Sequence, residues 1–228
     1  MIGSDDTRSE GPRDRAARTK RDRTRAALLH AAQTAFGLHG WAGTRMEHVA
    51  RSAGVSTASA YNHFPTKHVL IGHVYRPLVT ALQAEAEQDV ALARPVVAAL
   101  EDQVRALVRL TSQHRIVSGA FLAACQEYAA RVHAPARPDD ELDPRAIAPM
   151  PEAVRLLVAH GQATGELHAY PCAHDISSMI TTLLLVRAVE APQEPPEATA
   201  RLLLTMLFGA LLPERVAHKP LDGGTGPA

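Results

Sequence analysis

The most constraining feature of this sequence is the stretch from Thr44 to Lys67, TRMEHVARSAGVSTASAYNHFPTK, which predicts two short helices joined by a tight turn. Its first half places apolar residues at helical spacing, so that one face is buried: Met46, Val49, Ala50 and Ala53. Gly54 follows, at a position where glycine commonly ends a helix because it has no Cβ to oppose left-handed backbone. Ser56 is expected to cap the second helix.

We expect Thr44 to open the first of these helices. Its hydroxyl can accept a free backbone N–H, while Glu47, three residues later, reaches back to the cap in a capping box. The resulting order of helix, short turn and helix is a helix-turn-helix, a unit that can place its second helix in the major groove of DNA.

Composition favours an all-helical protein, because the 228-residue chain is rich in Ala and Leu, has 4% aromatic residues and contains few alternating β-branched runs. Its length suffices for a buried core and one or two domains. Cys125 and Cys172 are too few for a disulfide framework, and no apolar stretch follows the charged amino terminus as a secretory signal requires. We therefore expect a cytoplasmic protein with reduced thiols.

The formal net charge of zero conceals an uneven distribution. Residues 1–70 contain 11 Lys and Arg against 6 Asp and Glu, so the remainder of the chain has 13 against 18. A basic amino-terminal part joined to an acidic remainder suits a nucleic-acid reader attached to a body with another task. Charge alone is equally consistent with an uneven solvated surface.

Residues 1–20 mix charges of both signs with Gly, Pro and Ser and lack apolar periodicity, so we interpret them as a disordered basic arm. Such an arm is either a solvated tail or a segment that lies along DNA phosphates. A first helix is expected from about Arg21 to His39, with Gly40 as its stop. We assign residues 21–66 to the helix-turn-helix domain.

The second helix of the pair carries small and polar residues on the side away from Val55 and Phe64, which are expected to face inward. Small residues let a backbone approach base edges, hydroxyls bond to bases or phosphates, and Ala can touch a thymine methyl. The candidates for DNA contact on this helix are Thr57, Ala58, Ser59, Tyr61, Asn62 and His63. We expect Lys67, Thr44 and Arg45 to contact phosphates. The alternative for Tyr61 is a place in the domain's aromatic core.

The stretch GWAGTRMEHVARSAGVSTASAYNHFPTKHVL resembles the DNA-binding region of the tetracycline-repressor (TetR) family of transcriptional regulators. The matching positions are Gly40-Trp41, Thr44, Val49-Ala50, Ala53-Gly54-Val55-Ser56, Tyr61, His63-Phe64 and Lys67, in register over roughly 45 residues. The resemblance implies two sets of DNA contacts: bases for Thr57, Ala58, Ser59 and Tyr61, and backbone for Thr44, Arg45, Tyr61, His63 and Lys67.

Three positions depart from residues that are common in the family. Ala58 stands where many members have Gly, Ala60 where Leu is usual, and Arg45 where a second Thr is common. Ala60 removes apolar volume between the two helices, which affects the angle of the second one.

Residues 67–213 are expected to form a larger helical domain that binds a ligand and dimerises, and residues 214–228 a disordered tail. Helices are predicted over 67–92, with a disturbance at Pro77, and over 96–113, 116–132 and 152–163. The segment 133–151 contains five prolines and a cluster of acids, so we expect a surface loop.

The predicted helix 116–132 has polar atoms within an otherwise apolar strip. Such a strip lines a ligand cavity or belongs to an ordinary core, and the sequence favours neither. Its candidates for ligand contact are Phe121, Cys125 and Tyr128. His160, in a later helix, is a further candidate, although a histidine at such a position is more often at the edge of a core.

The segment around LHAYPCAH places His168, Cys172 and His174 within seven residues. Their spacing matches no compact zinc pattern and no fourth ligand is evident, so we expect neither a metal nor another cofactor. Redox sensing by Cys125 or Cys172 has no support in the sequence, because reactivity depends on stabilisation of the thiolate. A regulator that senses metal or oxidation is the alternative.

The last two predicted helices, 175–191 and 197–212, are apolar over more of their circumference than one core-facing stripe needs. Each is shorter than a membrane span and interrupted by polar residues, so we expect burial against protein and not in a membrane. Pairing with a second copy gives an isologous four-helix interface, which is how the family uses its final helices. The residues expected there are Ile180, Leu183, Leu184, Leu203, Leu207 and Phe208.

Together these features predict a homodimeric repressor that binds a palindromic double-stranded DNA operator and is released by a small-molecule effector. The alternative from another class is a small-molecule carrier or an enzyme. We expect no enzyme, because the sequence has no Ser/His/Asp set, Gly-rich phosphate loop or paired carboxylates to support catalysis.

Overall fold

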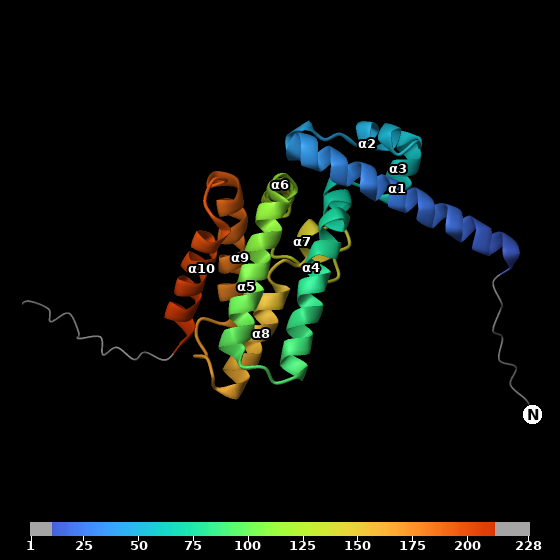
Figure 1. The fold of residues 1–228 in the computed structure, drawn as a ribbon. Helices are drawn as coiled ribbons and strands as arrows, with labels where there is room; N and C mark the ends of the chain where they lie inside the picture. Colours follow the sequence, from blue (N-terminus) through green and yellow to red (C-terminus); the bar gives the residue numbers. More distant parts are fainter. Residues whose placement is uncertain (1–10, 213–228) are drawn as a thin grey trace, which may run out of the picture.

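The computed structural model describes residues 11–212, and all regular secondary structure in this part of the chain is helical, which confirms the predicted all-α class. The helices are α1 (Pro12–Gly43), α2 (Met46–Ser52), α3 (Thr57–His63), α4 (Lys67–Ala91), α5 (Val96–Gln113), α6 (Arg115–Val132), α7 (Pro144–Ile147), α8 (Glu152–Thr164), α9 (Ala173–Glu190) and α10 (Pro196–Leu211). Helices α1 to α3 gather at one end, and α4 runs from them into a body of α5 to α10 (Figure 1).

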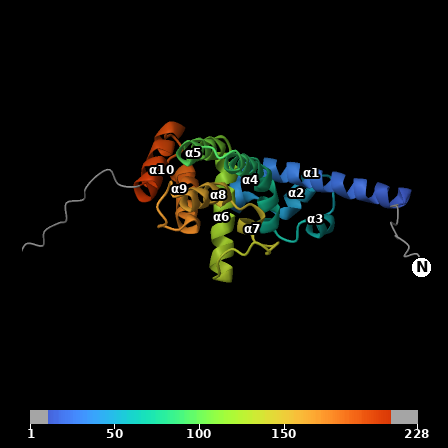
Figure 2. The ribbon, with the colours of Figure 1, turned by 90° about the horizontal axis from the view of Figure 1, so that it is seen from below.

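Helix α1 begins earlier than the sequence pattern suggests. Residues 12–20 are helical, so the prediction of a disordered arm is wrong for them, while residues 1–10 lie outside the described part. Pro12 occupies the first turn, where its missing N–H is not needed, and Ala and Arg dominate the positions that follow, which favours helix. The segment lacks apolar periodicity because it projects beyond the rest of the molecule (Figure 2) and is exposed.

Gly40 interrupts α1, as predicted, with φ 62° and ψ −163°, a backbone conformation that residues with a Cβ rarely adopt. After this break Trp41 stacks on Phe36, with ring centroids 6.1 Å apart. The core of the three-helix domain consists of fully buried side chains from α1, α2, α3 and the α3–α4 connection: Leu28, Ala32, Phe36, Val49, Ala60 and Phe64. Phe64 is thus a core residue, as expected.

Helix α4 connects the amino-terminal domain to the body. Thr66 caps it, because its side chain accepts a hydrogen bond from the Val69 N–H at 3.1 Å. The helix continues through Pro77 to Ala91. It packs on α1 in the amino-terminal domain and on α6, α7 and α8 in the body, so it belongs to both parts of the molecule.

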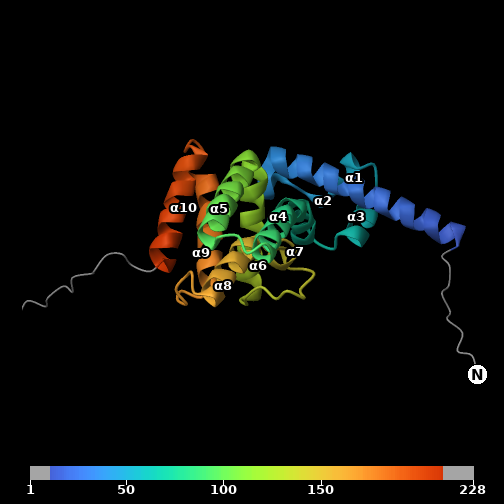
Figure 3. The same cartoon turned by 60° about the horizontal axis from the view of Figure 1, so that its bottom comes forward.

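The body is a helical bundle in which α5 and α8 lie between α4 on one side and α9 and α10 on the other (Figure 3). Its core is largely aliphatic, with fully buried Leu100, Leu107, Leu157, Leu184 and Leu203. None of the helices within residues 11–212 is both long and apolar enough to cross a membrane.

The predicted loop 133–151 contains the short helix α7. Asp143 is 1% exposed and caps this helix, because its carboxylate accepts the Arg145 N–H at 2.8 Å. The same carboxylate pairs with the Arg145 guanidinium at 2.7 Å. This buried acid therefore has its charge compensated by a neighbour two residues away.

Gly161 lets α8 pack closely against its neighbours. A Cβ at this position would lie 2.7 Å from Leu167 Cδ1 and 2.8 Å from Val96 Cγ1, closer than carbon atoms approach without displacement. Gly165 ends α8 in the left-handed region, with φ 79°.

His73 of α4 contacts the core of the amino-terminal domain. Its ring meets Phe64 edge-on, with centroids 5.6 Å apart. Burial lowers the pKa of His73 from 6.5 to about 4, and the nearby charges of Arg25 and Arg76 contribute to the same direction. The imidazole is therefore neutral at neutral pH.

Replacing Gly161 by Ala is expected to lower the free energy of unfolding by about 1–3 kcal/mol, because the new methyl group overpacks the α8 contact. Gly37→Ala is the matched control: its Cβ would lie 3.9 Å from Val117 Cγ2, an ordinary contact, so stability should be unchanged or slightly raised. Urea unfolding measures both variants. Equal losses would contradict the packing described at Gly161.

The neutral state of His73 predicts a loss of stability in acid. Because its pKa of about 4 in the folded chain lies below the ordinary 6.5, the unfolded chain binds more protons and folding weakens as pH falls from about 7 toward 4. His73 should account for roughly 1–2 kcal/mol of the loss between pH 7 and pH 5. Urea unfolding of His73→Gln at both pH values should show a loss smaller by this amount, and an identical loss would exclude His73 as the cause.

Candidate nucleic-acid interface

Helices α2 and α3 form the predicted helix-turn-helix. The turn is closed by backbone hydrogen bonds from Gly54 N–H to Arg51 carbonyl at 3.1 Å and from Val55 N–H to Ala50 carbonyl at 3.0 Å. Gly54 has φ 69°, the left-handed conformation expected of it. Ser56 caps α3 as predicted, because its side chain accepts the Ser59 N–H at 3.1 Å. The two helices lie beside α1 at the end of the molecule away from α8 (Figure 1).

The outer side of α3 presents the small and polar residues that were candidates for DNA contact. Ala58, Tyr61 and Asn62 are exposed, while Thr57, Ser59 and His63 are partly exposed. Tyr61 is 41% exposed and thus lies outside the domain core. The six candidates therefore share one short helix, with an aromatic ring, hydroxyls and an amide available to base edges or phosphates.

Thr44 and Arg45 differ in exposure. The prediction that Thr44 caps α2 is wrong: Arg45 is the N-cap residue, and the Thr44 hydroxyl instead donates to the Gly40 carbonyl at 2.7 Å. The break at Gly40 leaves this carbonyl free to accept, which explains why the 2% exposed Thr44 side chain turns inward. Arg45 is exposed at the start of α2, where a phosphate can reach it.

Lys67 has partners within the chain that the sequence pattern did not reveal. Its Nζ donates to the Trp41 carbonyl at 2.8 Å and to the Thr44 carbonyl at 3.3 Å, and it lies 3.9 Å from the centroid of the Trp41 ring. Burial lowers the pKa of Lys67. Since an ammonium group has three donors, at most one is left for a phosphate, and Lys67 also fixes the segment that leads into α2.

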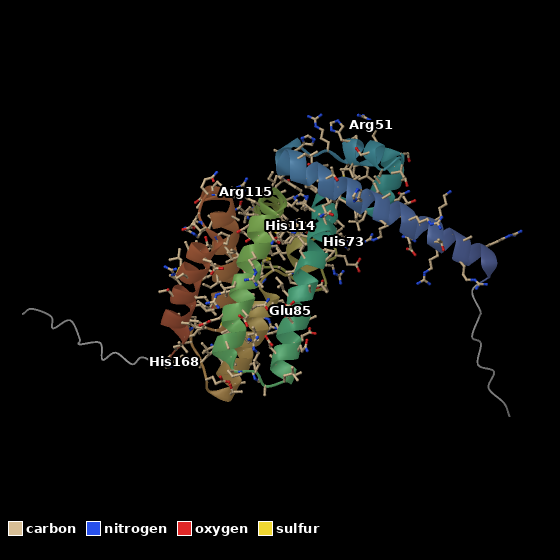
Figure 4. The ribbon with its side chains drawn as sticks, in the orientation of Figure 1. Arg51, His73, Glu85, His114, Arg115 and His168 are labelled. Carbon is tan, nitrogen blue, oxygen red and sulfur yellow. The ribbon has the colours of Figure 1, made fainter. Side chains whose placement is uncertain are left out.

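Positive charge gathers where α1 passes the end of α3. The Arg25 guanidinium lies 4.5 Å from the centroid of the Phe64 ring and donates to the His63 carbonyl at 3.5 Å. Burial, with Arg21 and Arg25 nearby, lowers the pKa of His63. Arg51 lies on the outer side of α2 (Figure 4). These arginines of α1 and α2 supply positive charge, which binds phosphates.

A groove of about 820 Å³ separates the end of α3 from the body. Its lining includes Arg25, His63, His73 and Arg76 and also the acids of the loop before α7, Asp139, Asp140 and Glu141. Arg25 and Arg76 bring positive charge to this groove from α1 and α4.

Three of the four candidates for effector contact lie on α6. Phe121 stacks on Tyr75 of α4, with ring centroids 4.3 Å apart and planes at 4°, and Tyr128 donates its hydroxyl to Asp140 at 3.0 Å. Burial raises the pKa of the Cys125 thiol to about 12, which disfavours the thiolate that redox sensing requires. His160 lies apart on α8.

The sequence did not indicate three polar side chains that lie in the core of the body, those of Tyr75, Ser118 and Gln103. The Tyr75 hydroxyl is 2.9 Å from Ser118 Oγ, a hydrogen-bonded pair inside the apolar contact of α4 with α6. Gln103 of α5 is 3% exposed, and its Nε2 has no hydrogen-bond partner among the described residues. Such groups are the ones that would direct a ligand in an apolar interior, but an isolated Tyr, Ser or Gln in the sequence does not signal burial.

Four of the residues predicted at a dimer interface belong to the chain's own core. Ile180, Leu184, Leu203 and Leu207 are 0–2% exposed within the single chain, so they have no surface left for a partner and the prediction is wrong for them. Leu183 and Phe208 are partly exposed. The apolar surface of these helices consists instead of other side chains: Met179 and Val189 on α9, and Leu202 and Met206 on α10.

Within residues 11–212, no group of three or more His, Cys, Asp or Glu side chains is arranged to hold a metal ion. The segment that contains His168, Cys172 and His174 lies at the far end of the body from α2 and α3, where Figure 4 shows His168.

Comparison with known proteins agrees with this arrangement. Residues 28–74, from the middle of α1 into α4, match the family described as "Bacterial regulatory proteins, tetR family". No curated protein matches the chain.

Solved structures of transcriptional regulators share the fold. FadR from Thermus thermophilus, a TetR-family repressor in complex with lauroyl-CoA, is 18% identical, with a TM-score of 0.67 over 88% of this chain and 100% of that one. A TetR-family regulator from Rhodococcus sp. is 20% identical, with a TM-score of 0.60 over 83% and 98%. RolR in complex with resorcinol is 21% identical, with a TM-score of 0.54 over 83% and 89%.

At these identities the solved structures support the fold of the described residues and nothing finer, while the match over residues 28–74 concerns the amino-terminal domain. Residues 28–74 therefore match the tetR family of bacterial regulatory proteins, and solved structures of TetR-family transcriptional regulators share the fold.

Proposed function

We propose that this protein is a homodimeric transcriptional repressor that binds a roughly palindromic DNA operator and is released from it by a small molecule. The observation that carries the proposal is the surface of α3, where exposed Ala58, Tyr61 and Asn62 stand on a capped helix at the amino-terminal end of the molecule. A helix presented in this way fits the major groove, and the surrounding arginines supply charge for phosphates.

The proposed contacts divide into two groups. Thr57, Ala58, Ser59 and Tyr61 face bases, while Arg45, His63 and the backbone around Thr44 meet phosphates. The direct phosphate contact of Lys67 is secondary to its internal bonds, because two carbonyl oxygens already accept from its ammonium group.

Two copies of this reading unit require a dimer, and the exposed apolar residues of α9 and α10 support one. Met179 of α9 is 64% and Met206 of α10 45% exposed, and α10 lies at the side of the body away from α1 (Figure 3). An isologous contact of both helices with their copies would cover these side chains and place two reading units on one face of the duplex. Half-sites one helical turn apart, or a multiple of it, would follow.

The effector is proposed to act within the body, where Tyr75, Ser118 and Gln103 place polar atoms in an apolar interior. The FadR and RolR structures with lauroyl-CoA and resorcinol support a small-molecule effector for a chain of this fold. DNA and effector would favour different spacings of the two reading units, with α4 carrying the change. A coupling free energy of about 1–3 kcal/mol is ordinary for such linkage.

Tyr61→Ala is expected to weaken binding to the promoter beside the protein's own gene by about tenfold or more, because it removes a side chain from the base-reading surface. Fluorescence anisotropy with a labelled duplex measures the Kd. Tyr170→Ala is the control, since Tyr170 is 83% exposed but lies on the body. Unchanged binding by Tyr61→Ala, or an equal loss in both variants, would contradict the proposed reading surface.

Met206→Glu is expected to weaken or abolish the dimer, because it places a charge in the proposed apolar contact. Light scattering after size exclusion should give twice the 24.5 kDa chain mass for the wild-type protein and a lower mass for the variant. Leu92→Glu, at an exposed apolar position at the end of α4, should leave the mass unchanged. A monomeric wild-type protein at micromolar concentration would refute the dimer.

A further inference from the structure

The contact between the DNA-reading domain and the body is centred on one carboxylate. Trp41, near the end of α1, donates its indole N–H to Glu127 Oε2 at 2.7 Å, and Glu127 belongs to α6 of the body. Glu127 has a 60% exposed side chain, whereas Trp41 is only 9% exposed. A buried indole donor is thus satisfied by an acid that reaches it from the other domain.

The same carboxylate faces the start of α4. Its Oε1 lies 3.3 Å from His68 Nε2, but the two groups are not aligned for a hydrogen bond, so this contact is weaker than the bond to Trp41. The His68 ring packs against Trp41 at 4.9 Å and against Tyr128 at 5.6 Å between centroids. Burial lowers the pKa of His68, against the opposing influence of Glu127, so the imidazole is neutral at neutral pH.

Trp41 in turn determines the segment that enters α2. Its carbonyl accepts from Lys67 Nζ, which also bonds the Thr44 carbonyl, and its ring lies beneath the same ammonium group. The backbone between Trp41 and Arg45 is therefore held from two sides, by Glu127 through the indole and by Lys67 through the carbonyls. Release of the indole would loosen the start of α2, and with it α3.

We propose that Glu127 is a positioning residue for DNA binding: its hydrogen bond to Trp41 holds α2 and α3 in the orientation that binds the operator. This inference rests on the proposed function of the α3 surface. A domain held in its binding orientation loses less conformational entropy on the DNA, so loss of the bond weakens binding without removing any contact to DNA.

The position of Glu127 also indicates how the body regulates the contact. Phe121 and Ser118, which touch Tyr75, precede Glu127 on the same helix. A displacement of α6 at Phe121 moves Glu127 relative to Trp41, because a helix transmits such a shift along its axis. An effector that binds in the body and displaces α6 would thus act on the DNA-reading domain through this bond.

The decisive experiment compares operator binding by Glu127→Ala and by Glu127→Gln. For Glu127→Ala, the positioning role and simple electrostatics predict opposite changes in affinity. Removal of a negative charge near a phosphate-binding surface strengthens DNA binding by electrostatics alone. Positioning predicts instead that Glu127→Ala weakens operator binding by about tenfold. Glu127→Gln should bind within about threefold of wild type, because the amide oxygen still accepts from the indole.

Trp41 provides a second readout, because it is the only tryptophan in the chain. Its emission should change in Glu127→Ala, where the indole loses its acceptor, and should return toward the wild-type spectrum in Glu127→Gln. Glu85→Ala, an exposed acid farther along α4 (Figure 4), is the control and should leave both spectrum and affinity unchanged.

Trp41→Phe tests the same bond from the other side and protects the experiment against a folding defect in Glu127→Ala. It keeps a ring but removes the donor, so it should weaken binding about as much as Glu127→Ala, and the double variant should be no weaker than either one. Circular dichroism and urea unfolding verify that each variant is folded.

Three results would overturn the proposal: operator binding by Glu127→Ala as tight as wild type or tighter, equal losses in Glu127→Ala and Glu127→Gln, or unchanged Trp41 emission in Glu127→Ala. Tyr61→Ala measured on the same duplex separates this failure from failure of the proposed function. If Tyr61→Ala weakens binding and Glu127→Ala does not, only the positioning role fails. If the wild-type protein does not bind the duplex specifically, the proposed function itself fails.

Discussion

The indole of Trp41 is the point on which the arrangement of the two domains depends. It stacks on Phe36 inside the amino-terminal domain, holds the ammonium group of Lys67 over its face and bonds Glu127 of α6 through its N–H. The three short-range contacts come from three different helices, so the residue cannot leave its place without loosening all of them. Aromatic packing of this kind combines a large buried area with a directed polar bond, which fixes orientation as well as distance.

This dependence follows from the small size of the amino-terminal domain. The domain contains only three helices, two of them short, and buries few side chains by itself. It completes its core by packing against α4, where Phe64 contacts His73. The surface left free is therefore the outer side of α3, with Tyr61 projecting from it. The same packing that ties the domain to the body thus leaves one helix available to DNA.

Much of the fold follows from local signals in the sequence. The caps Ser56 and Thr66 and the left-handed glycines Gly40, Gly54 and Gly165 act through backbone atoms a few residues away, so a single sequence reveals them. The bounds of α5 and α8 follow from apolar periodicity in the same way. The error over residues 12–20 has a local cause too, because an exposed helix needs no apolar stripe.

The parts that the sequence could not predict depend on contacts distant along the chain. Lys67 bonds carbonyls more than 20 residues away, and the partner of Trp41 lies 86 residues later, with no pattern to connect them. In α9 and α10 the apolar residues are too numerous to sort by pattern between core and surface. Only packing reveals that Leu203 and Leu207 are internal while Leu202 and Met206 face outward.

Selection of bound duplexes from a random-sequence DNA library tests the central claim most directly, because the operator sequence does not have to be known for it. If two α3 helices read DNA from a symmetric dimer, the recovered sequences will share an inverted repeat whose half-sites are one helical turn, or a multiple of it, apart. Recovery of unrelated sequences, or of a single half-site without its repeat, would contradict the account.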